Sequence, residues 1–531
     1  MWMLILGVAA LGIWPYLGEL GRIPMTADGR IWLEKGHPGA EGWFAWVFET
    51  RHFQVGYRPV TAVTYTATLA GVGVNLAVLR LTDLALHLSV AGLLACLVGR
   101  FTRGHSPWPG ALVALLFLAH PSAEEVVPYL ARRSYSLSLL LGLLATWFAT
   151  GAGIERTSRR IAVFTLAALS VLANELGVLA LVPLPLLVMA GRADGGKIGR
   201  AGILSAGLGL LAAFLIRQHV LGAVGGYEPD AEGAVGPARA LARSADSLLG
   251  FEPEGLGSVL ALFVVALHLR IARFGDRCGR LVTFALASGL LIGVALFVWL
   301  GVWFPRLGYA LAPAWAALTG LQLVRAYDAS GVRWGGPWFL ALLLAGVFPL
   351  VGSPLYSGPD GDRDLKWKRR DELTNALVLA IDRVESIAAR DPGEGGQRLQ
   401  LVLPASRFVE EGGEEERARP RLPRDARVPY RWAQFVRPET EVRVNEWVYV
   451  EEPDWDWGEP TLLEEVDGEL TLVAPTGRRL WTAGPPIRPE SGEPNTQILR
   501  IRPHERRDRW YVFLHDAEQG GVLVDLQASE R

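Results

Sequence analysis

The stretch RIPMTADGRIWLEKGHPGAEGWFAWVFETRHFQVGYRP, residues 22–59, is polar and rich in aromatic rings. It separates an apolar run at 2–20 from another at 79–99. Aromatic side chains favour a membrane–water interface, where one edge of the ring is apolar and the other is wet. The pattern therefore predicts a loop that lies on a bilayer and holds the carboxylate of Asp28 over a membrane cavity. The alternative is a structural loop with one solvated acid, and composition alone does not separate the two.

The apolar residues of the chain are concentrated in its first two thirds. The chain has 531 residues, of which 50% are hydrophobic. Before about residue 352 they form runs approaching the roughly 20 residues that a membrane helix needs. We therefore predict a transmembrane domain over 1–352 and a soluble domain over 353–531. The formal net charge of -2 conceals this division and says nothing about partners.

The apolar runs predict eleven membrane segments, in a polytopic α-helical fold. They cover approximately 2–20, 79–99, 108–119, 134–150, 160–173, 175–190, 201–220, 255–272, 281–303, 307–325 and 335–352. Two of them are short and end at polar breaks, His120-Pro121 and Asn174-Glu175. Such helix ends are tolerated at membrane depth where they line a cavity or pack against protein.

Basic residues predict the orientation of these segments. They concentrate in alternate loops: Arg100 and Arg103; Arg156, Arg159 and Arg160; Arg192, Lys197 and Arg200; Arg273, Arg277 and Arg280; Arg325 and Arg333. By the positive-inside rule these loops are cytoplasmic. We expect a multi-pass protein of the cell membrane with a cytoplasmic N-terminus. Residues 2–20 lack a basic start and a cleavage site, which favours a retained signal anchor. The loops 21–58, 120–133, 221–254 and 304–306, and the C-terminal domain, are then extracytoplasmic.

Four arginines on the predicted outer side break this rule: Arg58, Arg132, Arg133 and Arg306. Each lies at or beside a helix end. An arginine in such a place requires a partner, either a carboxylate of the protein or an anionic ligand.

The C-terminal region has the pattern of a small soluble domain. Residues 364–390 have the apolar spacing of one amphipathic helix. From 398 to 531, short runs such as ELTLVAP and RWYVFLHD predict a β-rich extracytoplasmic domain. The two cysteines, Cys96 and Cys278, lie near predicted cytoplasmic helix ends, so no disulfide framework is expected in the tail. No phosphate-binding glycine loop, metal-ligand cysteine pattern or nucleic-acid motif is present.

The predicted topology brings four groups of polar residues to one depth, the outer interface. They are Asp28 with Tyr57 and Arg58; Glu124, Glu125, Arg132 and Arg133; Asn174 and Glu175; and Arg306 with Tyr309. A carboxylate there can act as general base on a hydroxyl, and arginines there can neutralise a phosphate through charge-assisted hydrogen bonds. Together these groups suit transfer from a lipid phosphate to an acceptor hydroxyl.

Each group also has a structural interpretation. Glu124 and Glu125 could pair with the arginines that follow them. Glu175 could only complement a helix dipole. Asp83 and His87 are four residues apart on one helical face, and we expect this pair to satisfy itself within the bundle. Two such ligands do not make a metal site.

These residues, in this order, resemble the multi-spanning C-type (GT-C) glycosyltransferase superfamily. The likeness is to the membrane half of the transmembrane, tetratricopeptide-repeat O-mannosyltransferases and their bacterial relatives, and it covers about residues 1–350. The matching positions are Asp28; Tyr57, Arg58 and Pro59; His87; His120, Pro121 and Glu125, followed by Arg133; and Glu175.

The resemblance implies that Asp28 is the catalytic base and that the donor is a lipid-linked sugar. The family usually has two adjacent acids in the first loop and a Lys-Glu helix start. This chain has Asp28-Gly29 and Asn174-Glu175, and no tetratricopeptide repeats. A divalent metal would thus have a single loop acid to bind it, and no cofactor is assigned.

The sequence therefore predicts an integral-membrane glycosyltransferase that moves a sugar from a polyprenyl-phosphate donor to a protein or glycan acceptor. Asp28 is the expected base, and Arg133, Arg306, Arg58 and Arg132 are the expected phosphate ligands. The other pocket candidates are Tyr57, His87, His120, Glu124, Glu125, Glu175 and Tyr309. The alternative is a non-catalytic relative that binds a lipid or envelope polymer and recruits partners through its C-terminal domain. A transporter ranks last, because no inverted repeat of broken helices is found.

Overall fold

The computed structural model describes part of the chain. The described residues are 7, 10, 14, 16, 32–33, 35–38, 40, 42–49, 56–102, 108–123, 126–151, 153–193, 200–221, 277–300, 307–328, 379–386, 389–390, 397–406, 443–452, 462–466, 469–473, 480–482, 498–501, 509–514 and 522–525. Those up to 328 belong to one compact unit, and those from 379 onward belong to a second. The predicted boundary at 352 lies outside the described residues.

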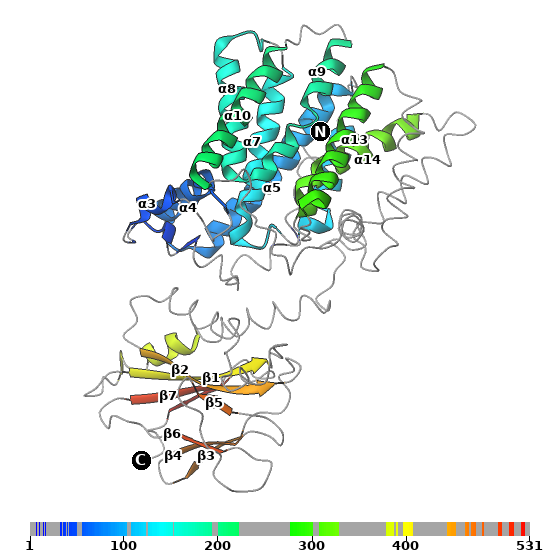
Figure 1. Ribbon diagram of the computed structural model, residues 1–531. Helices are drawn as coiled ribbons and strands as arrows, with labels where there is room; N and C mark the ends of the chain where they lie inside the picture. The colour runs from blue at the N-terminus through cyan, green and yellow to red at the C-terminus, as the bar shows by residue number, and fades with distance from the viewer. Residues whose placement is uncertain are drawn as a thin grey trace. The chain divides into compact units, whose positions relative to one another are not determined.

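The first unit is a bundle of helices (Figure 1). Its elements are α3 (Trp43–Val47), α4 (Pro59–Val72), α5 (Leu76–Phe101), α6 (Trp108–Leu118), the 3₁₀ helices η2 (Pro121–Ala123) and η3 (Leu130–Arg132), α7 (Arg133–Ala149), α8 (Thr157–Ala173), the 3₁₀ helix η4 (Glu175–Ala180), α9 (Leu184–Ala193), α10 (Ala201–Leu221), α13 (Arg277–Leu300) and α14 (Gly308–Asp328). They coincide with eight of the eleven predicted segments, 175–190 being divided between η4 and α9. Segments 255–272 and 335–352 lie outside the described residues, as does most of 2–20.

Length and composition identify candidate spans among these helices. Within the described part of the chain, Leu76–Phe101, Ala201–Leu221 and Cys278–Phe297 are long and apolar enough to cross a membrane. Trp108–Leu118 and Glu175–Gly191 are shorter apolar helices. The short ones are those that the sequence showed ending at, or starting from, a polar break; many of their residues are buried in the bundle, while Trp108 and Met189 are exposed.

Helix α4 follows the first loop directly and was not predicted. Pro59 occupies its first turn, where a fixed φ and a missing N–H cost nothing. Gly73, with φ 64°, ends it in a backbone region that glycine adopts readily. The helix is threonine-rich and only 14 residues long, shorter than the roughly 20 residues that a span needs. One face of α4, including Thr61, Ala62 and Tyr65, is buried against the bundle.

The described rings of the first loop divide into two sets, and the placement of the loop on a bilayer stays a prediction. Trp32 and Trp46 are buried and pack edge to face, with ring centroids 5.2 Å apart. Trp32 also stacks on Tyr65 of α4 at 5.1 Å. Phe44 and Phe48 are exposed. The buried tryptophans had a protein partner in α4, which an interpretation of the loop by itself could not include.

The bundle core positions η4, which carries Glu175. Buried side chains of α5, α6, α7, α13 and α14 form one apolar cluster, and α7, α8, α9 and α10 contribute to a second. Gly142 of α7 allows close packing: a Cβ there would lie 2.8 Å from Cβ of Ala180 in η4. Helix α7 thus packs directly against the segment that holds Glu175.

The second unit contains β strands and a short helical stretch. One sheet has the order β5-β2-β1-β7-β8 and another has β3-β4-β6. The strands are β1 (Gln397–Ser406), β2 (Arg443–Glu452), β3 (Leu462–Val466), β4 (Glu469–Val473), β5 (Leu480–Thr482), β6 (Ile498–Ile501), β7 (Arg509–Leu514) and β8 (Val522–Asp525). Strand β1 pairs in parallel with both β2 and β7. Residues 379–386, within the predicted amphipathic helix, are helical. The domain character of 353–531 and its extracytoplasmic location stay predictions.

Candidate functional site

Helix α4 lies across the ends of α7 and α8 and brings Tyr57 and Arg58 to η4. The Thr61 hydroxyl donates to the carbonyl oxygen of Ala173, the last residue of α8, at 2.9 Å. Arg58 is the residue that precedes α4. Two stretches that are more than a hundred residues apart in sequence therefore meet, as predicted from their common depth.

Glu175 lies between two arginines at this meeting point. Arg58 Nη2 donates to Glu175 Oε1 at 3.2 Å, and Arg217 Nη2 of α10 donates to Glu175 Oε2 at 3.2 Å. Arg217 Nη1 also donates to the carbonyl oxygen of Tyr57 at 2.8 Å. We call Glu175, Arg58, Arg217 and Tyr57 the Glu175 centre. One carboxylate faces two guanidinium groups, so the ionised set has a net charge of +1.

The side chains of the Glu175 centre differ in exposure. The Arg217 side chain is 0% exposed, whereas those of Arg58 and Glu175 are 11% and 14% exposed. Burial raises the pKa of the Tyr57 phenol above its ordinary value of 10.0, so the phenol stays protonated at neutral pH. Arg58 and Glu175 are thus the partly exposed members of the centre, and Arg217 is its buried member.

Asn174 fixes the backbone that carries Glu175. It is extended, with φ -161° and ψ 135°, and its Oδ1 accepts from the Leu176 amide at 3.0 Å as the cap of η4. Its Nδ2 donates to Ser134 Oγ of α7 at 3.1 Å. An asparagine provides both an acceptor and a donor, which the lysine usual in the resembled family does not. Glu175 is therefore more than an acid beside a helix dipole.

A second charged centre lies beneath α4. Arg133 Nε donates to Asp83 Oδ1, and Arg133 Nη2 donates to the Leu79 carbonyl oxygen at 3.3 Å. The Arg133 guanidinium also lies 4.1 Å from the centroid of the Tyr65 ring of α4. Its Nη1 donates to the carbonyl oxygen of Thr64 at 3.4 Å and to the hydroxyl of Thr68 at 3.3 Å. We call Asp83, Arg133 and these α4 contacts the Asp83 centre.

The Asp83 centre corrects two predictions about pairing. Asp83 pairs with Arg133 and not with His87. The carboxylate partner of Arg133 is therefore supplied by α5. His87 Nδ1 instead lies 2.8 Å from the Tyr309 hydroxyl, which is also 2.9 Å from Ser136 Oγ. The prediction failed because a spacing of four residues places two side chains on one face but does not say which neighbouring helix supplies a better partner.

The remaining predicted residues are separate or fall outside the described residues. The guanidinium of Arg132 lies 4.2 Å from the centroid of the Tyr129 ring. His120 is buried, and its Nδ1 lies 2.6 Å from Ser122 Oγ in its own turn. The predicted residues that lie outside the described part of the chain are Asp28, Glu124, Glu125 and Arg306.

Sequence reasoning missed Arg217. It lies inside the predicted segment 201–220, after the apolar run of α10 and before Gln218 and His219, and is fully buried. An ionisable residue within a membrane segment is a functional candidate by default, and that signal was available. Among the described residues, no group of three or more His, Cys, Asp or Glu side chains is arranged to hold a metal ion.

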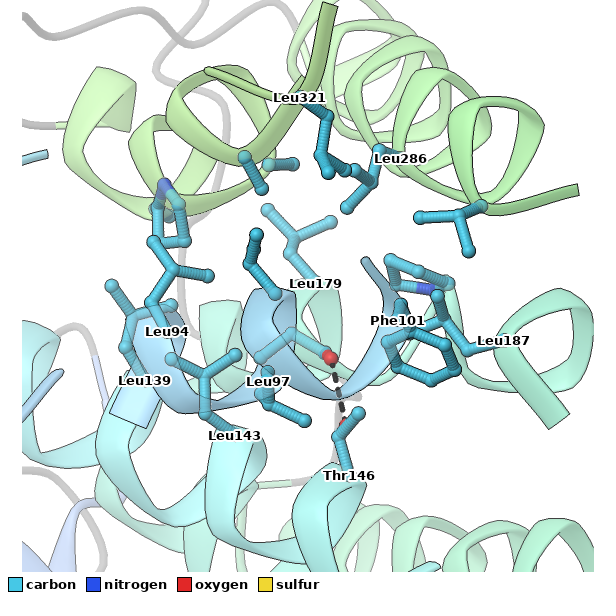
Figure 2. A pocket seen from close by; sticks show the side chains of 18 residues that line it. Leu94, Leu97, Phe101, Leu139, Leu143, Thr146, Leu179, Leu187, Leu286 and Leu321 are labelled. Atoms are coloured by element: carbon cyan, nitrogen blue, oxygen red, sulfur yellow. Dashed lines mark hydrogen bonds between the residues drawn. The ribbon is translucent and has the colours of Figure 1, made fainter. Parts of the chain in front are cut away.

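An apolar cavity lies deeper in the bundle, between α5, α7, α9, α13 and α14 (Figure 2). Its volume is about 60 Å³. Leucines from several helices line it, among them Leu94, Leu139, Leu179 and Leu321 (Figure 2). The hydroxyl of Thr146 in its wall donates to the Ala180 carbonyl oxygen at 3.2 Å. The cavity can therefore accept hydrocarbon but offers little to a polar ligand.

Comparisons with known proteins give structural similarities only. No family model matches the sequence, and no curated protein matches it. The structure is similar to that of ArnT from Cupriavidus metallidurans bound to undecaprenyl phosphate, with 12% identity over 85% of this chain and 93% of that chain and a TM-score of 0.45. It is also similar to that of the archaeal oligosaccharyltransferase AglB from Archaeoglobus fulgidus in complex with an inhibitory peptide and a dolichol-phosphate. That match has 12% identity over 85% of this chain and 69% of that chain and a TM-score of 0.44.

Proposed function

We propose that the chain is an integral-membrane glycosyltransferase that moves a sugar from a polyprenyl-phosphate donor to an acceptor hydroxyl on the outer face of the cell membrane. The Glu175 centre carries the proposal. Two arginines on one carboxylate leave a net positive charge at a helix junction, with the Arg58 side partly open. A phosphate is the anion that paired guanidinium groups match in shape and charge.

In this scheme the donor phosphate binds beside Arg58, with Arg217 as the charge behind it. Arg306 and Arg132 remain proposed ligands from other segments. Arg133 is reassigned: its Asp83 pair and its contacts to α4 make it the residue that holds α4 in place. Glu175 holds the two arginines close together and oriented while no anion is present, because its negative charge offsets the repulsion between them.

The reaction is a single displacement. The acceptor oxygen attacks the anomeric carbon of the sugar while Asp28 takes the hydroxyl proton. The bond between the anomeric carbon and the phosphate oxygen breaks, and its electron pair leaves with the polyprenyl phosphate. The arginines stabilise the negative charge that develops on that phosphate. Inversion at the anomeric carbon follows, and no metal is required by this scheme.

The apolar cavity suits the isoprenoid part of the donor. Its lining includes Ala310, the residue after Tyr309 in sequence, and Leu139 and Leu143, which follow Arg133 on α7. A volume of about 60 Å³ admits only a short stretch of chain, so the rest of the isoprenoid would lie against lipid.

The assay uses the full-length protein in lipid nanodiscs with a panel of polyprenyl-phosphate sugars. Asp28→Asn is expected to lower turnover by at least about a hundred-fold, since a positioned base contributes 10²–10⁴-fold. Glu49→Gln, which removes an exposed acid of the same loop, is the matched control and should leave turnover unchanged. Undiminished turnover in Asp28→Asn would remove that residue from the mechanism.

The second candidate is a non-catalytic relative that binds a lipid or envelope polymer and recruits partners through its C-terminal region. The single acid in the first loop favours it. Binding of polyprenyl phosphate without turnover of any sugar in the panel, and with Asp28→Asn indistinguishable from wild type, would favour this function over the first.

A further inference from the structure

The opposite end of α7 carries a second set of arginines. Helix α7 begins at Arg133 and ends at Ala149, which is about 25 Å away at 1.5 Å per residue. Arg100 of α5 and Arg156 and Arg159 at the start of α8 meet around the turn at Gly151–Gly153. We call these three residues the inner arginine cluster, because the predicted topology places their loops in the cytoplasm.

Arg100 is held rigidly in this cluster. Its Nη1 donates to the Trp147 carbonyl oxygen at 2.7 Å and to Thr150 Oγ1 at 3.0 Å. Its guanidinium carbon lies 3.4 Å from the centroid of the Trp147 ring. A guanidinium fixed by a ring and two oxygens loses little entropy when it binds a further anion.

Arg159 faces Arg100 across Gly151. A Cβ placed on Gly151 would be 3.2 Å from Arg159 Nη1 and 3.5 Å from Arg100 Nη1, so the two nitrogens are at most 6.7 Å apart. On the other side of the turn, a Cβ on Gly153 would be 3.7 Å from Arg159 Nη1 and 3.8 Å from Arg156 Nε. Three cationic groups thus surround one short turn, and neither Gly151 nor Gly153 places a side chain between them.

The inner arginine cluster differs from the neighbouring Arg160, which has a carboxylate partner. Arg160 donates to Glu155 at 2.6 Å. Among the described residues, the other ion pairs belong to Arg58, Arg133 and Arg217, and no carboxylate pairs with the inner arginine cluster. Like charges this close repel, so an anion between Arg100 and Arg159 would stabilise the turn.

The surroundings indicate which anion. Ile161 and Phe164 follow the cluster on α8 and are exposed, as are Leu204, Leu208 and Leu211 on α10, which packs against α8. This gives a basic site at a helix end, continued by an apolar face. Basic pockets between membrane helices on the cytoplasmic side bind the head groups of anionic lipids.

We propose that the inner arginine cluster binds the phosphate of an anionic phospholipid of the cytoplasmic leaflet, whose acyl chains lie along α8 and α10. The site is independent of the glycosyltransferase function, because it involves neither donor nor acceptor. A soluble phosphate could satisfy the same arginines, but it would not use the apolar face.

The test measures lipid binding by native mass spectrometry of the full-length protein in neutral detergent. Phosphatidylglycerol should bind at least about ten-fold more tightly than phosphatidylcholine. Arg159→Gln should weaken phosphatidylglycerol about ten-fold, the effect of losing one charge-assisted hydrogen bond. Arg160→Gln makes the same change of charge one residue away and should have no effect. Gly151→Ala keeps every charge but fills the space between Arg100 and Arg159, so it should weaken binding as much as Arg159→Gln.

Three results would overturn the proposal: equal affinity for the two lipids, equal losses in Arg159→Gln and Arg160→Gln, or wild-type binding in Gly151→Ala. Displacement of the lipid by millimolar inorganic phosphate alone would assign the cluster to a soluble anion instead. Circular dichroism shows whether each variant is folded. If Arg159→Gln does not fold, Gly151→Ala still tests the proposal.

Discussion

The Asp83 centre and the Glu175 centre are built from the same residue types, yet they differ in exposure. In the Asp83 centre Arg133 pairs with Asp83, their side chains are 0% and 5% exposed, and the buried Arg80 lies close enough to interact with Asp83 electrostatically. In the Glu175 centre two arginines share one carboxylate, and two of the three side chains are partly open. An enclosed pair suits a structural role, whereas a partly exposed one is the better candidate to take a ligand.

The largest effect is expected from breaking the enclosed pair. Arg133→Met leaves Asp83 charged and buried, and it should lower the free energy of unfolding by about 3–5 kcal/mol. The double variant Asp83→Leu/Arg133→Met should be more stable than Arg133→Met alone, since it does not leave Asp83 as a buried charge without Arg133. Denaturant unfolding in detergent, followed by circular dichroism, measures both. A loss below about 1 kcal/mol in Arg133→Met would mean that the pair does not hold α4.

The Glu175 centre should respond in binding more than in stability. Arg58→Gln should weaken polyprenyl phosphate binding by at least about ten-fold, because it removes a charge-assisted hydrogen bond to the phosphate. Its cost in stability should be about 1 kcal/mol, since Glu175 keeps Arg217. Titration of polyprenyl phosphate into nanodiscs gives the affinity.

Arg133→Gln is the matched comparison for Arg58→Gln. It removes the same charge from a residue that we assign to structure, so it should lower stability strongly while the folded fraction keeps its affinity. The reverse pattern, with Arg133→Gln weakening the binding and Arg58→Gln not, would exchange the roles of the two centres.

The sequence could predict where the helices lie and which ends meet. The length of an apolar run is physically tied to the thickness of a bilayer, so α5, α10 and α13 follow from hydropathy. The meeting of Arg58 with Glu175 followed from depth, because both were assigned to one interface. The C-terminal domain and the outer location of the site stay predictions.

The partners within each centre could not be predicted. Pairing depends on how each helix is rotated and on what covers it, and neither is encoded by hydropathy. Asp83 and His87 share a face of α5, yet Arg133 and Tyr309 are better partners because other helices bring them there. Arg217 and α4 were both missed: Arg217 lies within a segment that was predicted from its apolar residues, and α4 is too short to be recognised as a span.

A smaller effect is expected in the apolar cavity. Ala314→Leu adds a branched side chain to its wall, with a change in stability within about 1–3 kcal/mol. If the cavity takes isoprenoid, the variant should lose a few-fold in affinity for a long polyprenyl phosphate but not for a short-chain analogue, at about 0.8 kcal/mol per buried methylene. Ala85→Leu, on an exposed position of α5, is the control. Equal losses for both chain lengths would place the effect at the head group rather than the tail.

The smallest effect tests whether α4 connects the two centres. Thr61→Val removes one hydrogen bond to the Ala173 carbonyl and should cost about 1 kcal/mol. Thr68→Val removes a hydroxyl that accepts from Arg133 and donates to the Thr64 carbonyl at 2.8 Å, with a similar cost. The two variants have the same chemistry on one helix, but Thr61 lies beside Glu175 and Thr68 beside Asp83. Thr61→Val should therefore weaken polyprenyl phosphate binding two- to three-fold or so, while Thr68→Val should change stability alone. Equal effects on binding would mean that α4 moves as one rigid body, and that the two centres act as a single site.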